Sequence, residues 1–349
     1  MSGTWIRRLG AAVPAIILGA MAFTGAVTVT APQRAQALDN GLAQTPPMGW
    51  SGFTVFGRDV TASIVEAEAR AMVASGMQAA GYNYVDLDGG WNLLQRGPDG
   101  SLLPDPSKFP DGIKPVADYV HSLGLKLGIY ASAGITNCNG TTAGSYGHYQ
   151  QDANTFASWD VDFVKVSWCK VPLDDFPGQT IEQVATTLGQ QFRDAIANAG
   201  RPMVFDYDLN IDCPNNCEDW LWGAPIANEW RTGPNTSNTW KNVMLNFSLN
   251  VPTYAYAGPG AWNDPGPLEI GNGALTPDEA QSEFSLWAEM AAPLLAGNDP
   301  STMSDATRDI LTNSDVIRVD QDPLGQQGFA VSDSNGDWVL TKPLANGGR

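Results

Sequence analysis

The chain has 349 residues, 43% of them hydrophobic and 16% charged, a composition typical of a soluble globular protein with ample core. Its 37 acidic residues outnumber 19 basic ones, and the formal net charge is −18. This balance argues against nucleic acid or an anionic membrane as a partner, because both attract basic proteins, and it suits a neutral ligand.

The N-terminus has the pattern of a signal peptide. Arg7-Arg8 precede an apolar run over residues 9–30, and Ala35-Gln36-Ala37 supplies the small residues of a cleavage site. A membrane anchor is the alternative, but Pro14 and several Gly and Thr residues make the run a poor span. We therefore expect residues 1–37 to be a signal peptide and the protein to be secreted, by the general or the twin-arginine route.

After this leader, short apolar runs alternate with amphipathic segments. The runs expected to form strands cover residues 46–50, 82–88, 126–130, 163–166, 202–208, 227–231, 254–257 and 294–297. The segments expected to form helices cover residues 59–78, 111–123, 150–159 and 179–199. Strands that alternate with helices predict a parallel sheet, and eight at these intervals predict a (β/α)8 barrel, the TIM-barrel fold, over residues 38–327. A doubly wound open sheet is the alternative, weakened because the sequence has no Gly-rich phosphate loop.

The last residues follow a different pattern. Apolar and polar residues alternate from Gly328 to Leu340 around Ser334-Asn335-Gly336-Asp337, which predicts an antiparallel hairpin. We assign residues 328–349 to the beginning of a separate β domain.

Four cysteines in an exported chain favour two disulfides. Cys138 and Cys169 follow consecutive predicted strands and are expected to bridge, while Cys213 and Cys217 would close a small loop. Zinc is the alternative, but paired C-x-x-C motifs and nearby His ligands are missing, so we expect neither a metal nor a cofactor.

The run that begins at Phe163 continues Lys165-Val166-Ser167-Trp168-Cys169. It resembles the fourth barrel strand of the α-galactosidases (glycoside hydrolase family 27, melibiases), where the position of Ser167 is an Asp that acts as the catalytic nucleophile. Further motifs carry the resemblance over most of residues 46–328: Pro46-Pro47-Met48-Gly49-Trp50, Phe109-Pro110-Asp111-Gly112, residues 120–130, residues 257–265 and Asp320-Gln321-Asp322-Pro323-Leu324-Gly325.

The resemblance implies a retaining hydrolase of terminal α-galactosides, with an antiparallel β domain after the barrel that is truncated here. It also implies the residues that contact the sugar. They are Trp50, Asp88, Tyr130, Cys138, Lys165 and Arg231, with Asp208 near the sugar's 2-position. Aromatic faces suit a sugar ring, and charged groups can hold its hydroxyls by charge-assisted hydrogen bonds. Barrel-mouth packing for the aromatic residues and a structural ion-pair network for the charged ones are the alternative interpretations.

Four acidic positions of the family are replaced. The nucleophile position is Ser167, the general acid/base position is Asn235, and two sugar-facing acids are replaced by Gly89 and Gly266. A serine without an adjacent base is a poor nucleophile, and an asparagine cannot serve as a general acid. The sequence leaves open a rescue by displaced carboxylates, for which the candidates are Asp206, Asp208, Asp212 and Glu229.

Three hypotheses follow from these replacements. The first is a secreted α-galactosidase-type hydrolase scaffold that binds terminal α-galactosides but has impaired catalysis. The second is a non-catalytic carbohydrate-binding paralogue or inactivated variant, and the third is a hydrolase of altered specificity, for example toward β-L-arabinopyranosides. The sequence leaves the oligomeric state open.

Overall fold

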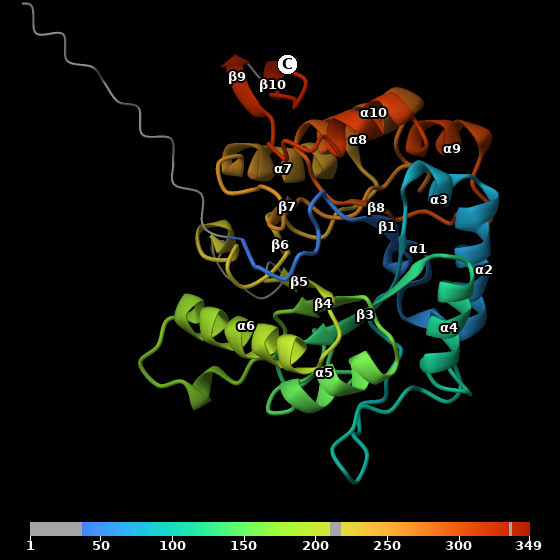
Figure 1. Cartoon of the computed structure of the whole chain (residues 1–349), viewed down its shortest axis with the longest axis vertical. Coiled ribbons are helices and arrows are strands. Elements are labelled where there is room, and N and C mark those ends of the chain that lie inside the picture. Colours follow the sequence, from blue (N-terminus) through green and yellow to red (C-terminus); the bar gives the residue numbers. More distant parts are fainter. Residues whose placement is uncertain (1–36, 210–217, 335–336) are drawn as a thin grey trace, which may run out of the picture. The chain divides into compact units, whose positions relative to one another are not determined.

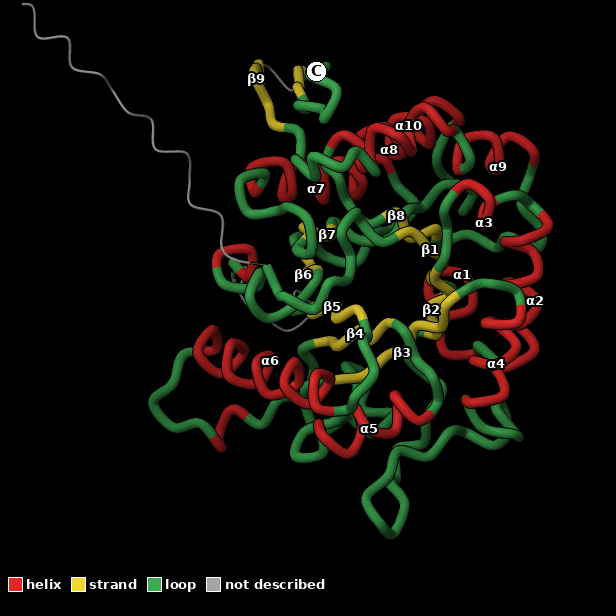
Figure 2. Tube along the Cα trace, in the orientation of Figure 1, coloured by secondary structure: helices red, strands yellow, loops and turns green. Residues whose placement is uncertain are grey.

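Eight short parallel strands form one sheet, and helices surround it (Figures 1 and 2). A computed structural model describes residues 37–209, 218–334 and 337–349, so nearly all of the expected signal peptide lies outside the described residues. The strands are β1 Met48–Ser51, β2 Tyr84–Leu87, β3 Lys126–Ser132, β4 Phe163–Ser167, β5 Val204–Asp208, β6 Glu229–Arg231, β7 Trp262–Asp264 and β8 Leu294–Ala296.

The sheet curls into a barrel. Its strand order is β7-β6-β5-β4-β3-β2-β1-β8, and all paired neighbours are parallel. An isolated parallel bridge between Leu268, which follows β7, and Ala296 of β8 joins the two edges. The predicted (β/α)8 fold is confirmed.

The helices run on the outside of the sheet, and several of them begin with a side-chain cap. They are α1 Phe53–Phe56, α2 Ala62–Ala74, α3 Met77–Ala80, α4 Lys114–Ser122, α5 Tyr149–Ser158, α6 Ile181–Asn198, α7 Trp240–Asn250, α8 Pro277–Glu289, α9 Asp305–Leu311 and α10 Ser314–Asp320. Thr180 caps α6 in a reciprocal capping box with Gln183, which supplies partners for backbone groups that a helix start leaves unpaired. Val184, Leu188 and Phe192 then form the buried stripe at four-residue spacing.

The seventh strand lies later than the sequence suggested. Residues 254–257, predicted as a strand, form turns after the 3-10 helix Val251–Thr253, and β7 begins at Trp262. Pro252 explains the difference, because it stands in the first turn of that 3-10 helix, where its fixed φ and missing N–H continue helical geometry rather than a strand ladder.

The predicted C-terminal hairpin is present. β9 Phe329–Ser334 and β10 Asp337–Thr341 pair antiparallel as a separate two-stranded sheet. Trp338 of β10 packs edge-on against Phe247 of α7, with ring centroids 5.2 Å apart. This contact attaches the small sheet to the barrel's helical layer.

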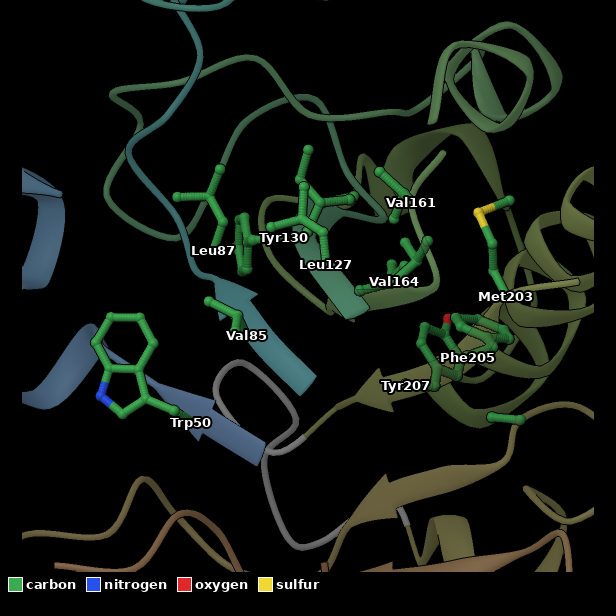
Figure 3. Close-up of a cluster of buried hydrophobic side chains, with 14 of the residues drawn as sticks. Trp50, Val85, Leu87, Leu127, Tyr130, Val161, Val164, Met203, Phe205 and Tyr207 are labelled. Atoms are coloured by element: carbon green, nitrogen blue, oxygen red, sulfur yellow. The ribbon is translucent and has the colours of Figure 1, made fainter. Parts of the chain in front are cut away.

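The core lies between the sheet and the surrounding helices. Figure 3 shows part of it, with Trp50, Val85 and Leu127 from three successive strands. All three side chains are fully buried. Strand residues alternate between this outer layer and the barrel interior, so the residues next to them in sequence point inward.

The predicted bridge between Cys138 and Cys169 is present. It ties the loop after β3 to the residues that follow β4, and backbone hydrogen bonds run alongside, including the one that Ile135 N donates to Lys170 O at 3.1 Å. Cys213 and Cys217 lie outside the described residues.

We predict that the double substitution Cys138→Ser, Cys169→Ser lowers the free energy of unfolding by about 3–4 kcal/mol, because the bridge closes a loop of 31 residues. Denaturant titration measures the change. The matched control is Cys213→Ser with Cys217→Ser, since any bond between those residues closes a much shorter loop and should contribute less. An unchanged unfolding midpoint in the first variant would contradict the prediction.

Candidate functional site

Two cationic side chains form ion pairs with acidic side chains at the C-terminal end of the parallel sheet. Lys165 Nζ on β4 lies 2.9 Å from Asp88 Oδ2 and 3.8 Å from Asp208 Oδ2. Arg231 on β6 places Nε 2.8 Å from Asp264 Oδ2 and Nη2 3.8 Å from the same Asp208 oxygen. Asp208 is therefore shared by both cations, and the five side chains form one network.

The network keeps both cations charged. Burial alone would lower the pKa of Lys165, but the carboxylates of Asp88 and Asp208 outweigh it, so the pKa lies above its usual value. For Arg231 too, burial is opposed by Asp264 and Asp208, and the net shift of the pKa is upward. Buried ion pairs of this kind leave a costly unpaired charge when either partner is removed.

A pocket of about 580 Å³ opens above this network. This volume falls within the range of small-molecule sites. Eight of the residues predicted from sequence contribute to its wall: Asp88, Gly89, Tyr130, Cys138, Lys165, Ser167, Arg231 and Asn235. They come from the ends of β2, β3, β4 and β6 and from the loops after those strands, where barrel proteins place ligand-binding groups.

Trp50 is not part of this wall. It is 0% exposed, and its indole Nε1 donates to Asn298 O at 2.7 Å. The side chain of Ser51 does line the pocket, and because neighbouring strand residues point to opposite faces, Trp50 points outward. The aromatic residue on this side of the pocket is Phe53, three positions further along, whose residue surface is 40% exposed.

Asp208 and Gly266 also lie behind the pocket surface rather than on it. Asp208 is fully buried and accepts a hydrogen bond from Ser167 Oγ at 3.4 Å. Gly266 N donates to Asp264 Oδ1 at 2.7 Å, and its φ of +109° is one that other residues rarely adopt. A Cβ at Gly266 would lie 2.4 Å from Thr236 Oγ1, so no side chain fits there without rearrangement.

The two positions expected to correspond to catalytic carboxylates carry neutral groups with partners of their own. Ser167 is 1% exposed and donates to Asp208. Asn235 Oδ1 accepts from Arg231 Nη1 at 3.2 Å. Among the described residues that line the pocket, Asp88 supplies the one carboxylate, and that carboxylate is engaged by Lys165 and by the backbone N–H of Gly89.

Histidine does not reach the pocket. His121 pairs with Asp162 at 2.7 Å, and His148 Nδ1 lies 3.0 Å from Gln151 Oε1. Neither histidine lines the pocket, so no Ser-His pair activates Ser167.

A layer of buried acids lies inside the barrel, beneath the network. Asp86, Asp206 and Glu229 each stand two residues before a network residue on the same strand, so they share its inward face. Burial raises the pKa of Asp86 to about 8. Burial, reinforced by neighbouring carboxyl groups, raises the pKa values of Asp206 and Glu229 well above their usual range. We infer that these three carboxyl groups hold protons near neutral pH.

Carboxyl oxygens of Asp206, Glu229 and Asp264 lie within 4.8 Å of one another, and among the described residues this is the one group that could hold a metal ion. Asp264 is already bound to Arg231, and all three residues are fully enclosed. The same closeness contributes to the upward shift of the pKa values of Asp206 and Glu229, because a neighbouring carboxylate disfavours ionisation.

These positions bear on the displaced-carboxylate hypothesis. Asp206, Asp208 and Glu229 are buried beneath the pocket and do not line it, while Asp212 lies outside the described residues. Groups that do not reach the pocket cannot transfer protons to a ligand bound there.

Sequence reasoning missed several wall residues, chiefly Phe53, Arg58 and Asn137. The period-two alternation around Trp50 could have indicated that its neighbours, rather than Trp50, face the pocket. Arg58 and Asn137 stand in loops and carry no such periodic signal.

A parallel barrel with a polar pocket at the carboxyl ends of its strands is the architecture of a barrel enzyme. Residues 45–322 match the protein family described as alpha galactosidase A. The α-galactosidase of Cyamopsis tetragonoloba is 41% identical over 309 residues, which cover 88% of this chain and 72% of that protein. The chain therefore belongs to the α-galactosidase family, glycoside hydrolase family 27.

Solved structures agree with this assignment. The α-galactosidase of Saccharomyces cerevisiae, determined with raffinose, superposes with a TM-score of 0.83 at 28% identity and covers 90% of this chain and 74% of its own. A β-L-arabinopyranosidase of the same family from Geobacillus stearothermophilus superposes with a TM-score of 0.75 at 25% identity, covering 87% and 82%. Within the described part of the chain, no helix has the length and apolar character needed to cross a bilayer.

We predict that Asp86→Asn reduces the pH dependence of stability. The folded protein holds the Asp86 proton up to a pKa of about 8, whereas an unfolded chain releases it near 3.8, so rising pH destabilises the wild type between those values. Between pH 5 and pH 8 the fall in free energy of unfolding should shrink by on the order of 2–4 kcal/mol.

Denaturant titrations at the two pH values measure this change. Asp99→Asn is the control, because Asp99 is exposed and hydrogen bonds from Ser101 lower its pKa, so it titrates below the window. An identical pH slope in Asp86→Asn and wild type would refute the assignment of a proton to Asp86.

Proposed function

We propose that the chain is an exported protein that binds terminal α-galactosides in the 580 Å³ pocket and whose hydrolytic activity is lost or strongly impaired. The family supports the sugar class. One observation supports the proposed loss of activity. Among the described residues that line the pocket, Asp88 is the one that has a carboxylate.

Retaining glycoside hydrolysis needs two carboxyl groups about 5–5.5 Å apart, one as nucleophile and one as acid and base. The expected positions carry Ser167 and Asn235, which are neutral. Asp88 is neutralised by Lys165 and accepts from Gly89 N, so it is held as a binding group rather than offered as a nucleophile. Hydrolysis of an arabinopyranoside would need the same carboxyl pair, so the altered-specificity alternative has no support from the pocket wall.

The groups that remain can hold a sugar. Tyr130 and Phe53 offer aromatic surface, and burial together with the Asp88 carboxylate raises the pKa of Tyr130, so its hydroxyl stays protonated. Lys165 and Arg231 supply charged donors fixed by buried partners. Hydrogen bonds to such fixed donors contribute to affinity without a large ordering cost.

We predict saturable galactose binding with a dissociation constant of about a millimolar. This value is expected for a ligand of this size in a site that has fewer acidic groups to bind its hydroxyls. Turnover of an aryl α-galactoside should lie about 10⁴- to 10⁶-fold below that of an active relative, because the nucleophile is missing. Calorimetric titration measures the dissociation constant, and release of the aryl group measures the turnover. Turnover at ordinary enzyme rates would contradict the proposal, and so would a complete lack of sugar binding.

We predict that Ser167→Asp with Asn235→Asp restores turnover by about 10²-fold or more over the parent, because it returns both charges to the pocket wall. The matched control is Ser167→Asn in the Asn235→Asp background, which has the same side-chain size without the nucleophile's charge. Equal turnover in the two variants would show that the charge at position 167 does no chemistry. Galactose binding is measured in both variants. A variant that binds galactose but shows no turnover is folded and lacks only catalysis.

A further inference from the structure

The pocket wall is richer in cations than the rest of the protein. Three cationic side chains, Arg58, Lys165 and Arg231, line it together with one carboxylate, Asp88. The chain as a whole carries a net charge of −18. Lys165 and Arg231 are balanced by carboxylates, so Arg58 is the cation of the wall whose role has to be explained. A cationic side chain in a pocket wall can attract an anionic ligand.

Arg58 differs from the other two cations. Lys165 and Arg231 each face buried carboxylates. Among the described residues, no carboxylate lies within ion-pair distance of Arg58, and its side chain makes one hydrogen bond, from Nη1 to Thr141 Oγ1 at 3.0 Å. A guanidinium has five N–H donors, so most of those on Arg58 remain available to a ligand.

The backbone of Arg58 is fixed at the pocket edge. Its carbonyl accepts from Lys108 Nζ at 2.6 Å, and Lys108 also donates to Gly90 O at 2.9 Å. The backbones of Arg58 and Gly90 are in close contact, since a Cβ at Gly90 would lie 2.9 Å from Arg58 Cα. Gly90 directly follows Gly89, which lines the pocket at a position where the family resemblance expects an acid. Arg58 is therefore anchored next to Gly89.

The guanidinium of Arg58 is also held by its contact with Thr141. Thr141 Oγ1, which accepts from Arg58, accepts from Asn137 Nδ2 at 3.1 Å as well. Asn137 and its neighbours Cys138 and Asn139 line the pocket, and the disulfide to Cys169 secures this turn. The wall around Arg58 therefore presents amide and guanidinium N–H donors, and the one carboxylate among the described lining residues, Asp88, is already paired with Lys165.

We propose that the sugar bound in this pocket carries an anionic substituent, a carboxylate or a sulfate ester, and that Arg58 binds that substituent at the rim. The inference rests on the proposed sugar-binding function and adds to it the chemical class of the ligand. Guanidinium groups match both kinds of anionic oxygen by paired, charge-assisted hydrogen bonds. A neutral galactoside offers Arg58 hydroxyl acceptors, which make weaker hydrogen bonds than an anionic oxygen does.

The test compares the affinities of galactose, galacturonate, galactose 6-sulfate and inorganic sulfate for the full chain by calorimetric titration. At least one anionic sugar should bind roughly tenfold more tightly than galactose, as expected for a charge-assisted contact at a partly exposed site. The preference should shrink in 0.5 M salt, where exposed charges are screened beyond about 4 Å. The tighter of the two anionic sugars identifies the substituent.

Arg58→Gln should abolish the preference for the anionic sugar while galactose still binds, which also shows that the variant folds. Arg318→Gln is the matched control, because Arg318 is an exposed arginine on α10 and does not line the pocket. Equal affinity of the wild type for neutral and anionic sugars would overturn the inference, and so would a preference that survives in Arg58→Gln. Inorganic sulfate binding as tightly as the sulfated sugar would also overturn it.

The two proposals fail in different ways. If no sugar binds the wild type, the proposed function is contradicted. If galactose binds but gains nothing from an anionic substituent, the sugar-binding function stands and only the role of Arg58 is refuted.

Discussion

The shared carboxylate of Asp208 is the contact on which the site depends. It lies 3.8 Å from both Lys165 Nζ and Arg231 Nη2, and it accepts from Ser167 Oγ. Two cations in a barrel interior repel one another unless a carboxylate lies between them. Because Asp208 fills that place from β5, the flanking strands can carry Lys165 and Arg231 on the floor of the pocket, and both side chains have defined positions before any ligand arrives.

The same balance of charges bears on the positions of Ser167 and Asn235. Asp88, Asp208 and Asp264 already pair with the two buried cations, so the network needs no further acid at either position. It is complete with neutral side chains there. The charges that hold the buried network together are therefore separate from the groups that face a ligand.

The sequence predicted the barrel because its evidence was periodic and repeated. Seven of the expected strand runs overlap strands of the sheet, and the exception is the run at residues 254–257, where Pro252 and the preceding helix favour turns. Convergence of Asp88, Lys165 and Arg231 was predictable, since each lies at or near the carboxyl end of a strand. Trp50 illustrates the limit, because a motif places a residue near a site without stating which face of the strand it occupies. The buried acids Asp86, Asp206 and Glu229 were present in the sequence, but their protonation follows from burial, which a sequence does not reveal.

Gly89 and Gly266 differ in the room that their surroundings leave for a side chain. At Gly89 the nearest atoms to a Cβ would be those of the Tyr130 ring at 3.4 Å, an ordinary contact, so a Cβ fits there. At Gly266 the backbone has φ +109° and Thr236 Oγ1 occupies the space that a side chain would need. A non-glycine residue in that conformation is strained even without the clash. The surroundings of Gly266 therefore favour a glycine at this position, whereas those of Gly89 leave room for a Cβ.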